Sequence, residues 1–192
     1  MLTPSAIRRH LDRLTKPPGS LGRLEDLAVR LCDIQQTLAP KTQPRRLVLF
    51  AADHGVVAEG VTAWPAEVTH LMVQNILGGG AASSVLARTT QTELRVIDVG
   101  TLGPDLGAVH GYACRKVRAG SRNLATGPAL TGEEFERALA VGREQVELAA
   151  ADGIRVLAAG EMGIGNSTPA SCLTALLAGV RGDGGRPGRR GR

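Results

Sequence analysis

The stretch 160–169, read Gly-Glu-Met-Gly-Ile-Gly-Asn-Ser-Thr-Pro, constrains the fold more than any other part of the chain. It joins an apolar run at residues 154–159 to an apolar segment at residues 170–177. This order predicts a strand, a glycine turn and a helix. Glycines let backbone N–H groups approach an anion closely, and a helix start adds unpaired donors and a positive dipole end. The turn is therefore either a simple tight connection or a phosphate site.

Polar side chains crowd the same stretch, and they favour the second interpretation. They are Glu161, Asn166, Ser167 and Thr168, next to the glycines Gly163 and Gly165. Open α/β sheets bind their ligands at the carboxyl ends of parallel strands, which is where this cluster is expected. The glycine spacing matches neither the dinucleotide motif nor a Walker loop with its lysine. The sequence therefore favours a nucleotide monophosphate over NAD or ATP.

Strand and helix patterns alternate along most of the chain. Strands are predicted at residues 46–52, 94–99, 112–117 and 154–159, and helices at residues 65–77, 81–87, 131–151 and 170–177. The alternation predicts an α/β fold: a doubly wound, mainly parallel, Rossmann-like sheet with flanking helices and right-handed crossovers. Two helices, at residues 2–14 and 21–38, precede it, and Ser20 is expected to cap the second.

We expect three segments: an N-terminal helical segment (1–40), an α/β domain (41–179) and an Arg/Gly-rich tail (180–192). The tail, expected to be disordered or out of frame, carries +4 of the net charge of +5, so the rest is close to neutral. It has neither aromatic residues for stacking on bases nor helical periodicity. Nucleic-acid binding is therefore the least favoured function.

The three cysteines, Cys32, Cys114 and Cys172, are odd in number and lack the spacing of a zinc site. They are expected to be free, buried thiols in a reducing compartment. The first ten residues lack the apolar region of a signal peptide, and no apolar run approaches the ~18 residues that span a membrane. These features predict a cytoplasmic protein that binds no membrane.

Four further residues are candidates with more than one interpretation each. Asp53 and His54 follow a predicted strand, where they form an acid–base pair, orient a sugar hydroxyl or belong to an ordinary turn. Trp64 either packs in the interior or forms the flat wall of an aromatic pocket. Lys16, beside two prolines, either meets an anion or is a solvated surface lysine.

Four motifs together resemble the nicotinate-nucleotide:dimethylbenzimidazole phosphoribosyltransferase family. They read KPPGSLGRLE at 16–25, ADHGV at 52–56, VIDVG at 96–100 and GEMGIGNSTP at 160–169. Their order and spacing match the family as well, so the resemblance covers roughly residues 11–179. It implies transfer of the phosphoribosyl group of nicotinate mononucleotide to 5,6-dimethylbenzimidazole, giving α-ribazole 5′-phosphate and nicotinate in cobalamin biosynthesis.

The resemblance also implies roles for single residues. Residues 163–168, with Gly163, Gly165, Asn166, Ser167 and Thr168, would bind the 5′-phosphate, and Glu161 would face the ribosyl or base region. Trp64 and Met72 would lie near the pocket of the benzimidazole-type base, and Asp53 and His54 would line the cleft. Neither a metal nor a cofactor is implied, and the full-length form is expected to be a homodimer.

One departure from the family pattern affects the expected activity. The general base proposed for the family is a glutamate in a glycine-rich motif that has no counterpart in this sequence. The resemblance stops near residue 179. We therefore expect a fragment of the enzyme with no assignable catalytic residue. The alternative function is a non-catalytic nucleotide-binding module that retains the phosphate site.

Overall fold

A computed structural model describes residues 1–179 and divides the chain into two units, Met1–Gln43 and a second that begins at Pro44. The first unit is a pair of helices, α1 (Pro4–Leu11) and α2 (Arg23–Gln35), which pack around Ile7, Val29 and Cys32. The predicted cap at Ser20 is wrong, because the residue before α2 is Gly22, with φ 54°. The backbone turns through Gly19 and Gly22, and Ser20 lies two residues short of the capping position.

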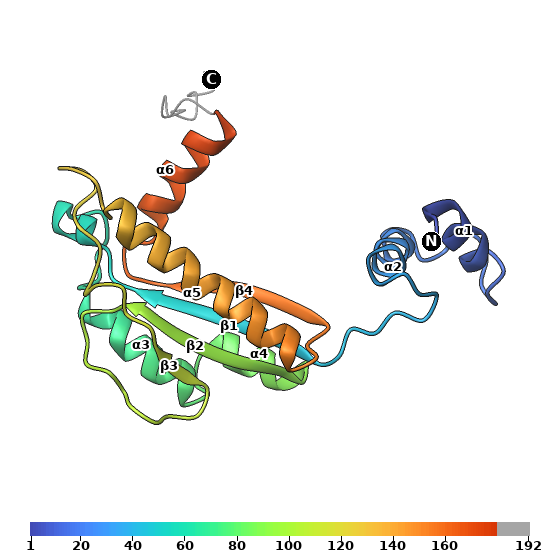
Figure 1. The fold of residues 1–192 in the computed structure, drawn as a ribbon, viewed down its shortest axis with the longest axis horizontal. Coiled ribbons are helices and arrows are strands. Elements are labelled where there is room, and N and C mark those ends of the chain that lie inside the picture. The colour runs from blue at the N-terminus through green and yellow to red at the C-terminus, as the bar shows by residue number, and fades with distance from the viewer. Residues whose placement is uncertain (180–192) are drawn as a thin grey trace, which may run out of the picture. The chain divides into compact units, whose positions relative to one another are not determined.

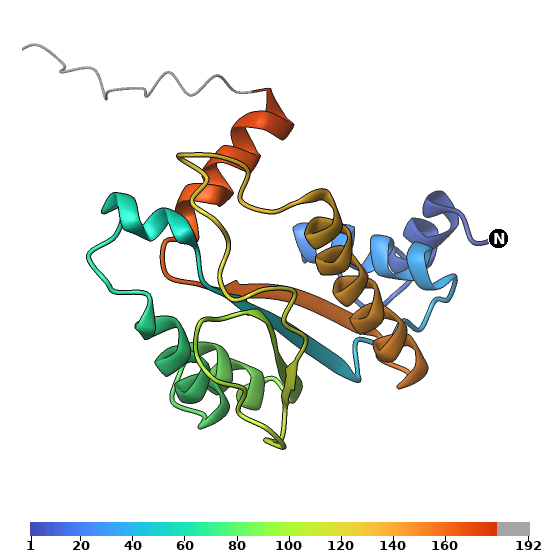
Figure 2. The same ribbon diagram turned by 60° about the vertical axis from the view of Figure 1, so that its left-hand side comes forward.

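The second unit is a four-stranded parallel sheet flanked by helices, which confirms the predicted α/β fold (Figure 1). Its elements, in chain order, are β1 (Arg45–Ala52), the short 3-10 helix η1 (Gly55–Glu59), α3 (Glu67–Leu77), α4 (Ala82–Thr89), β2 (Thr92–Gly100), β3 (Tyr112–Cys114), α5 (Gly132–Ala151), β4 (Val156–Met162) and α6 (Ser167–Ala178). Helices α3 and α4 cover one face of the sheet and α5 covers the other (Figures 1 and 2). Two covered faces explain why Val48 and Leu49 on β1, and Val96 and Ile97 on β2, are consecutive buried residues.

The order of the strands is β3-β2-β1-β4, so the chain leaves β1 toward one side and returns to its other side with β4. The strand order therefore reverses between β1 and β4. In open α/β sheets a crevice opens outside the carboxyl ends of the strands at such a point, and ligands bind there. The fold places the ends of β1 and β4 side by side at this position.

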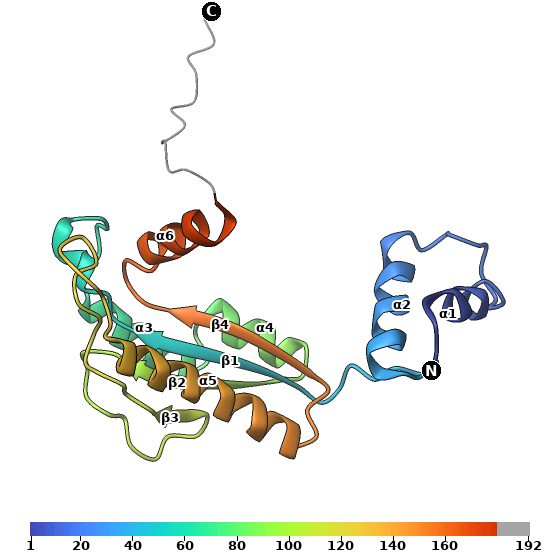
Figure 3. The same cartoon turned by 45° about the horizontal axis from the view of Figure 1, so that its top comes forward.

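Two boundaries around the glycine turn differ from the prediction. Strand β4 continues through Gly160 and Glu161 to Met162, because these residues pair with Leu49, Phe50 and Ala51 of β1. Helix α6 begins at Ser167 instead of at residue 170. Pro169 lies in its first turn, where a backbone N–H is not needed. The turn itself is therefore only residues 163–166, and α6 extends beyond the end of β4 (Figure 3).

Candidate functional site

The loops after β1 and β4 meet at the reversal of strand order. Gly163, directly after β4, packs so tightly that a Cβ there would collide with the carbonyl oxygen of Ala52 and lie 2.8 Å from His54 Nε2. Gly165 has φ +82°, and a Cβ would lie 2.9 Å from a Val57 methyl group. Close approach requires glycine at position 163, and positive φ together with close approach requires it at position 165. The two glycines let the turn pack against the loop after β1.

The N–H groups of the turn are partly occupied by the protein itself. Ile164 donates to Thr69 Oγ1 of α3 at 3.0 Å, and the buried Thr69 thereby ties the turn to that helix. Asn166 donates to Gly163 O and Thr168 to Gly165 O. Within the described chain the N–H groups of Gly165 and Ser167 have no protein acceptor. Unpaired N–H groups at the start of a helix suit an anion.

Glu161 and Asn166 form a hydrogen-bonded pair at the rim of the turn. Asn166 Nδ2 donates to Glu161 Oε1 at 2.6 Å, and Asn166 makes no side-chain cap on α6. Glu161 also lines a groove of about 380 Å³ between β4, α3 and α4, together with Met72 of α3. Two of the residues predicted for the base region, Glu161 and Met72, thus face the same groove.

Asp53 is buried and joins three segments of the chain. Its Oδ2 accepts a hydrogen bond from Leu102 N at 2.7 Å, and its backbone pairs with Gly100 and Ser121. Its Oδ1 is buried without a hydrogen-bond partner among residues 1–179. The interpretation as an ordinary turn that caps a following N–H is wrong, because the N–H that donates to Asp53 is 49 residues away.

His54 lies against Gly163 and has an altered basicity. Burial lowers the pKa of its imidazole, while the carboxylates of Glu161 and Asp53 raise it by a smaller amount. The lowered pKa favours the neutral ring at pH 7, which accepts a proton at one nitrogen and donates one at the other. His54 therefore places a neutral base within the cluster of Glu161, Asp53 and the glycine turn.

A loop at residues 121–128 closes one side of the site. It presses on Gly55, where a Cβ would lie 2.6 Å from the backbone of Ser121 and Arg122. Ser121 Oγ accepts from Gly55 N, and Asn123 Nδ2 donates to Glu59 Oε1 at 2.6 Å. The loop is thus fixed to η1 by these two side chains.

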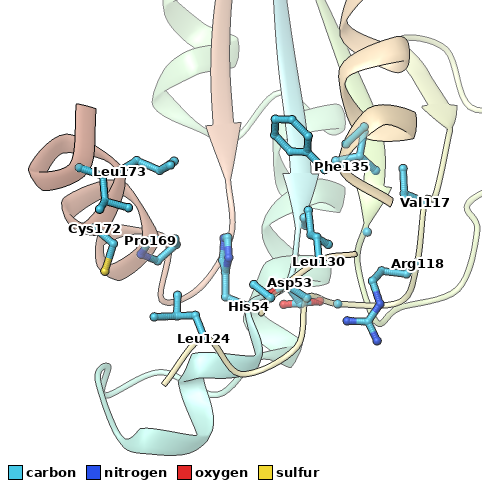
Figure 4. Close-up of a pocket in the computed structure, with 18 residues that line it drawn as sticks. Asp53, His54, Val117, Arg118, Leu124, Leu130, Phe135, Pro169, Cys172 and Leu173 are labelled. Atoms are coloured by element: carbon cyan, nitrogen blue, oxygen red, sulfur yellow. The ribbon is translucent and has the colours of Figure 1, made fainter. Parts of the chain in front are cut away.

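Between this loop, α5 and α6 lies a mostly apolar crevice of about 440 Å³ (Figure 4). Asp53 and His54 lie at its floor, and its walls include Leu124, Leu130, Phe135 and Leu173. Arg118 also lines it. Sequence reasoning missed Arg118, since an isolated arginine in a glycine-rich segment without periodicity gives no signal.

The structure also tests the predicted environments of the remaining candidate residues. Trp64 is exposed on the turn ahead of α3 and lines neither of the two cavities just described. Lys16 is neither free nor solvated, because its Nζ pairs with Glu25 at 2.8 Å and both side chains are largely buried. The prediction of buried thiols is right for Cys32 and wrong for Cys114, which is half-buried, and for Cys172, which is exposed on α6. The predicted tail, residues 180–192, lies outside the described residues.

Two kinds of feature are absent from residues 1–179. None of their helices is long and apolar enough to cross a membrane. Nor do three or more of their His, Cys, Asp and Glu side chains gather in a way that could hold a metal ion.

The fold and the site define a doubly wound α/β protein with its candidate ligand site where the strand order reverses. A family model described as "Phosphoribosyltransferase" matches residues 3–184. The curated nicotinate-nucleotide–dimethylbenzimidazole phosphoribosyltransferase of Thermus thermophilus is 51% identical over 90% of the chain and 51% of its own length. That of Solidesulfovibrio magneticus is 48% identical over 90% of the chain and 49% of its own length.

A solved structure agrees with these sequence relatives. The crystal structure of CobT from Thermus thermophilus superposes with a TM-score of 0.87 at 50% identity, covering 92% of this chain and 53% of the other. The chain belongs to this phosphoribosyltransferase family, as its motifs predicted. It spans about half the length of the curated relatives it matches.

Proposed function

We propose that the chain binds nicotinate mononucleotide and serves the transfer of its phosphoribosyl group to 5,6-dimethylbenzimidazole, giving α-ribazole 5′-phosphate and nicotinate for cobalamin biosynthesis. The names of the relatives specify these two substrates. The observation that supports the proposal most is the glycine turn between β4 and α6, packed on His54 where the strand order reverses. A phosphate is the ligand that suits such a turn.

In this proposal the phosphate accepts hydrogen bonds from the N–H groups of Gly165 and Ser167. The hydroxyls of Ser167 and Thr168, in the first turn of α6, are further donors nearby. The acceptor base occupies the groove lined by Met72 and Glu161, whose apolar walls suit a planar ring. The role of Trp64 near that base stays a prediction from the resemblance.

The chemistry asks little of the protein beyond position and charge. A nitrogen of the incoming imidazole attacks the anomeric carbon, the bond to the pyridinium nitrogen breaks, and its electron pair neutralises the ring that leaves. The imidazole N–H proton must then be removed. Glu161, which lines the groove, and neutral His54, which lies against Gly163 of the turn, are candidate proton acceptors.

A glycine pair tests the phosphate site. We expect Gly163→Ala to weaken binding of nicotinate mononucleotide by roughly tenfold or more in calorimetry, because the added methyl group collides with Ala52 and His54. Gly142→Ala, where a Cβ meets nothing within 4 Å, is the matched control and should bind normally. Unchanged binding in Gly163→Ala would refute the proposed phosphate site.

An assay with both substrates separates the transferase from the alternative. Formation of α-ribazole 5′-phosphate supports transfer by the chain, whereas calorimetric binding without product supports the non-catalytic nucleotide-binding module.

Deleting residues 180–192 tests the least favoured function, nucleic-acid binding. That function predicts a salt-dependent affinity for nucleic acid that is lost with the deletion. The homodimer of the full-length form stays a prediction, which sedimentation would check. The cytoplasmic location also stays a prediction.

A further inference from the structure

Helix α3 carries a polar residue at a position where its neighbours in the core are apolar. Its buried residues are Thr69, Val73 and Ile76, and their spacing puts all three on one side of the helix. Val73 and Ile76 belong to the apolar core of the second unit, whereas Thr69, at 0% exposed, brings a hydroxyl into the interior. Burying a hydroxyl is unfavourable unless it forms a hydrogen bond. The partner of this hydroxyl therefore explains why a threonine stands here instead of a valine.

The partner is the glycine turn after β4. Thr69 Oγ1 accepts a hydrogen bond from Ile164 N at 3.0 Å, although the two residues are 95 positions apart in the sequence. The N–H groups of Asn166 and Thr168 donate instead to carbonyl oxygens of the same stretch. Within residues 1–179, Thr69 is thus the only side chain that accepts a hydrogen bond from the backbone of the turn at residues 163–166.

This bond holds the turn next to its free donors. Ile164 directly precedes Gly165, whose N–H, like that of Ser167, has no acceptor in the described part of the chain. Gly163 and Gly165 already pack against the loop after β1, and the bond to Thr69 attaches the turn to a second element, α3. Two separate elements therefore fix the peptide groups that a phosphate would meet.

We propose that Thr69 is a positioning residue for the phosphate of the nucleotide, which it does not touch itself. This inference rests on the proposed function. By accepting from Ile164 N, Thr69 fixes the orientation of the neighbouring peptide group, whose N–H belongs to Gly165. Donors that are held in place before binding lose less conformational entropy when the ligand arrives. Loss of this bond therefore weakens the binding of the phosphate and leaves the rest of the nucleotide unaffected.

Calorimetry of the full chain with nicotinate mononucleotide and with nicotinate riboside, which lacks the phosphate, tests this assignment. We expect the wild type to prefer the mononucleotide by about tenfold or more. Thr69→Val has nearly the same shape but leaves Ile164 N without an acceptor. Its affinity for the mononucleotide should fall about fivefold or more, and its affinity for the riboside should change less than about twofold. Thr69→Ser keeps the hydroxyl and should bind the mononucleotide within about twofold of the wild type.

Ser84→Ala is the matched control. Ser84 is also a buried hydroxyl residue, and its Oγ donates to Ile76 O of α3 at 2.7 Å. The variant therefore removes a buried hydrogen bond to the same helix without affecting the turn, and it should bind both ligands as the wild type does. A loss of mononucleotide affinity equal to that of Thr69→Val would mean a general loosening of α3 and would overturn the assignment.

The other outcomes are equally decisive. The assignment is wrong if Thr69→Val binds the mononucleotide normally, if Thr69→Ser loses as much affinity, or if the riboside is weakened to the same extent. Should Thr69→Val fail to fold, Thr69→Ala replaces it, because it differs from Thr69→Ser only by the hydroxyl; equal affinities in that pair overturn the assignment. A wild type that prefers the mononucleotide supports the phosphate site even where the Thr69 variants refute this inference. A wild type that binds neither ligand refutes the proposed function, and this inference with it.

Discussion

Glu134 links three neighbours beside the crevice. Its carboxylate accepts hydrogen bonds from both Nη atoms of Arg122 and lies near Arg118. It also closes the capping box of α5 by accepting a hydrogen bond from Thr131 N at 2.7 Å. These partners lower the pKa of its carboxyl to about 2, with the hydrogen bond from Arg122 as the largest cause. Glu134 therefore stays charged at any ordinary pH and holds the loop at residues 121–128 to α5.

The lowered pKa of Glu134 predicts how the stability lost on replacing its carboxylate depends on pH. Because the folded pKa is below the ordinary 4.5, the charged carboxylate stabilises the fold above about pH 4.5, and this contribution is lost as the pH falls toward 2. Glu134→Gln retains the capping box, since glutamine serves at that position. We expect it to melt at a lower temperature than the wild type at pH 7, and the difference should shrink between pH 4.5 and 2. A difference independent of pH would contradict this account.

Single residues also show what the sequence could not predict. Asp98 lies in a motif that carried the family resemblance, yet its physical role became visible only in the structure. It is buried and accepts hydrogen bonds from Gly100 N, Thr101 N, Thr101 Oγ1 and Tyr112 Oη. Tyr112 comes from a strand whose existence the local sequence indicated only weakly. Long-range pairs such as this one depend on how strands are ordered, which no local pattern encodes.

At the scale of elements, the long helix α5 was the most predictable. Thr131 and Glu134 form the capping box that the Thr-x-x-Glu pattern indicated. We expect Thr131→Ala to destabilise the chain by about 1 kcal/mol in urea unfolding, because Glu134 N loses its acceptor. Thr131→Ser keeps the hydroxyl and should cost much less. Equal losses in both variants would show that the methyl group, not the cap, matters.

A glycine inside the same helix offers a gain in stability. Gly142 lies in the middle of α5 and has open space where a Cβ would be added. Gly142→Ala should stabilise the chain by about 0.5–1 kcal/mol in urea unfolding, because alanine loses less backbone entropy in a helix. A destabilised variant would mean that this face of α5 needs the space.

The elements around the turn were less predictable than α5. Strand propensity argues against Gly160 and Glu161, but pairing with β1 extends β4 through both. The pattern at residues 170–177 placed the helix after Pro169, although proline is tolerated in a first helical turn. Alternation and apolar runs predicted the parallel α/β sheet, whereas the pairing partners that set these ends come from elsewhere in the chain.

At the scale of the whole molecule, each unit has a core of its own. Ile7, Val29 and Cys32 form one, and a set around Leu49, Val73 and Val96 forms the other. Ile7 is fully buried, so Ile7→Ala should cost its helical pair about 2–5 kcal/mol. Amide hydrogen exchange should accelerate in residues 4–35 and stay unchanged in β1 and β2. Faster exchange throughout would mean that the two units unfold together.

Arg118 and Arg122 share the carboxylate of Glu134, so the effects of substituting them depend on one another. When one arginine is removed, the other still pairs with Glu134, so each single substitution costs little stability. When both arginines are removed, only the Thr131 N–H still donates a hydrogen bond to the Glu134 carboxylate. The two positions should therefore behave synergistically in a double-mutant cycle, and effects measured one at a time will understate what the pair does together.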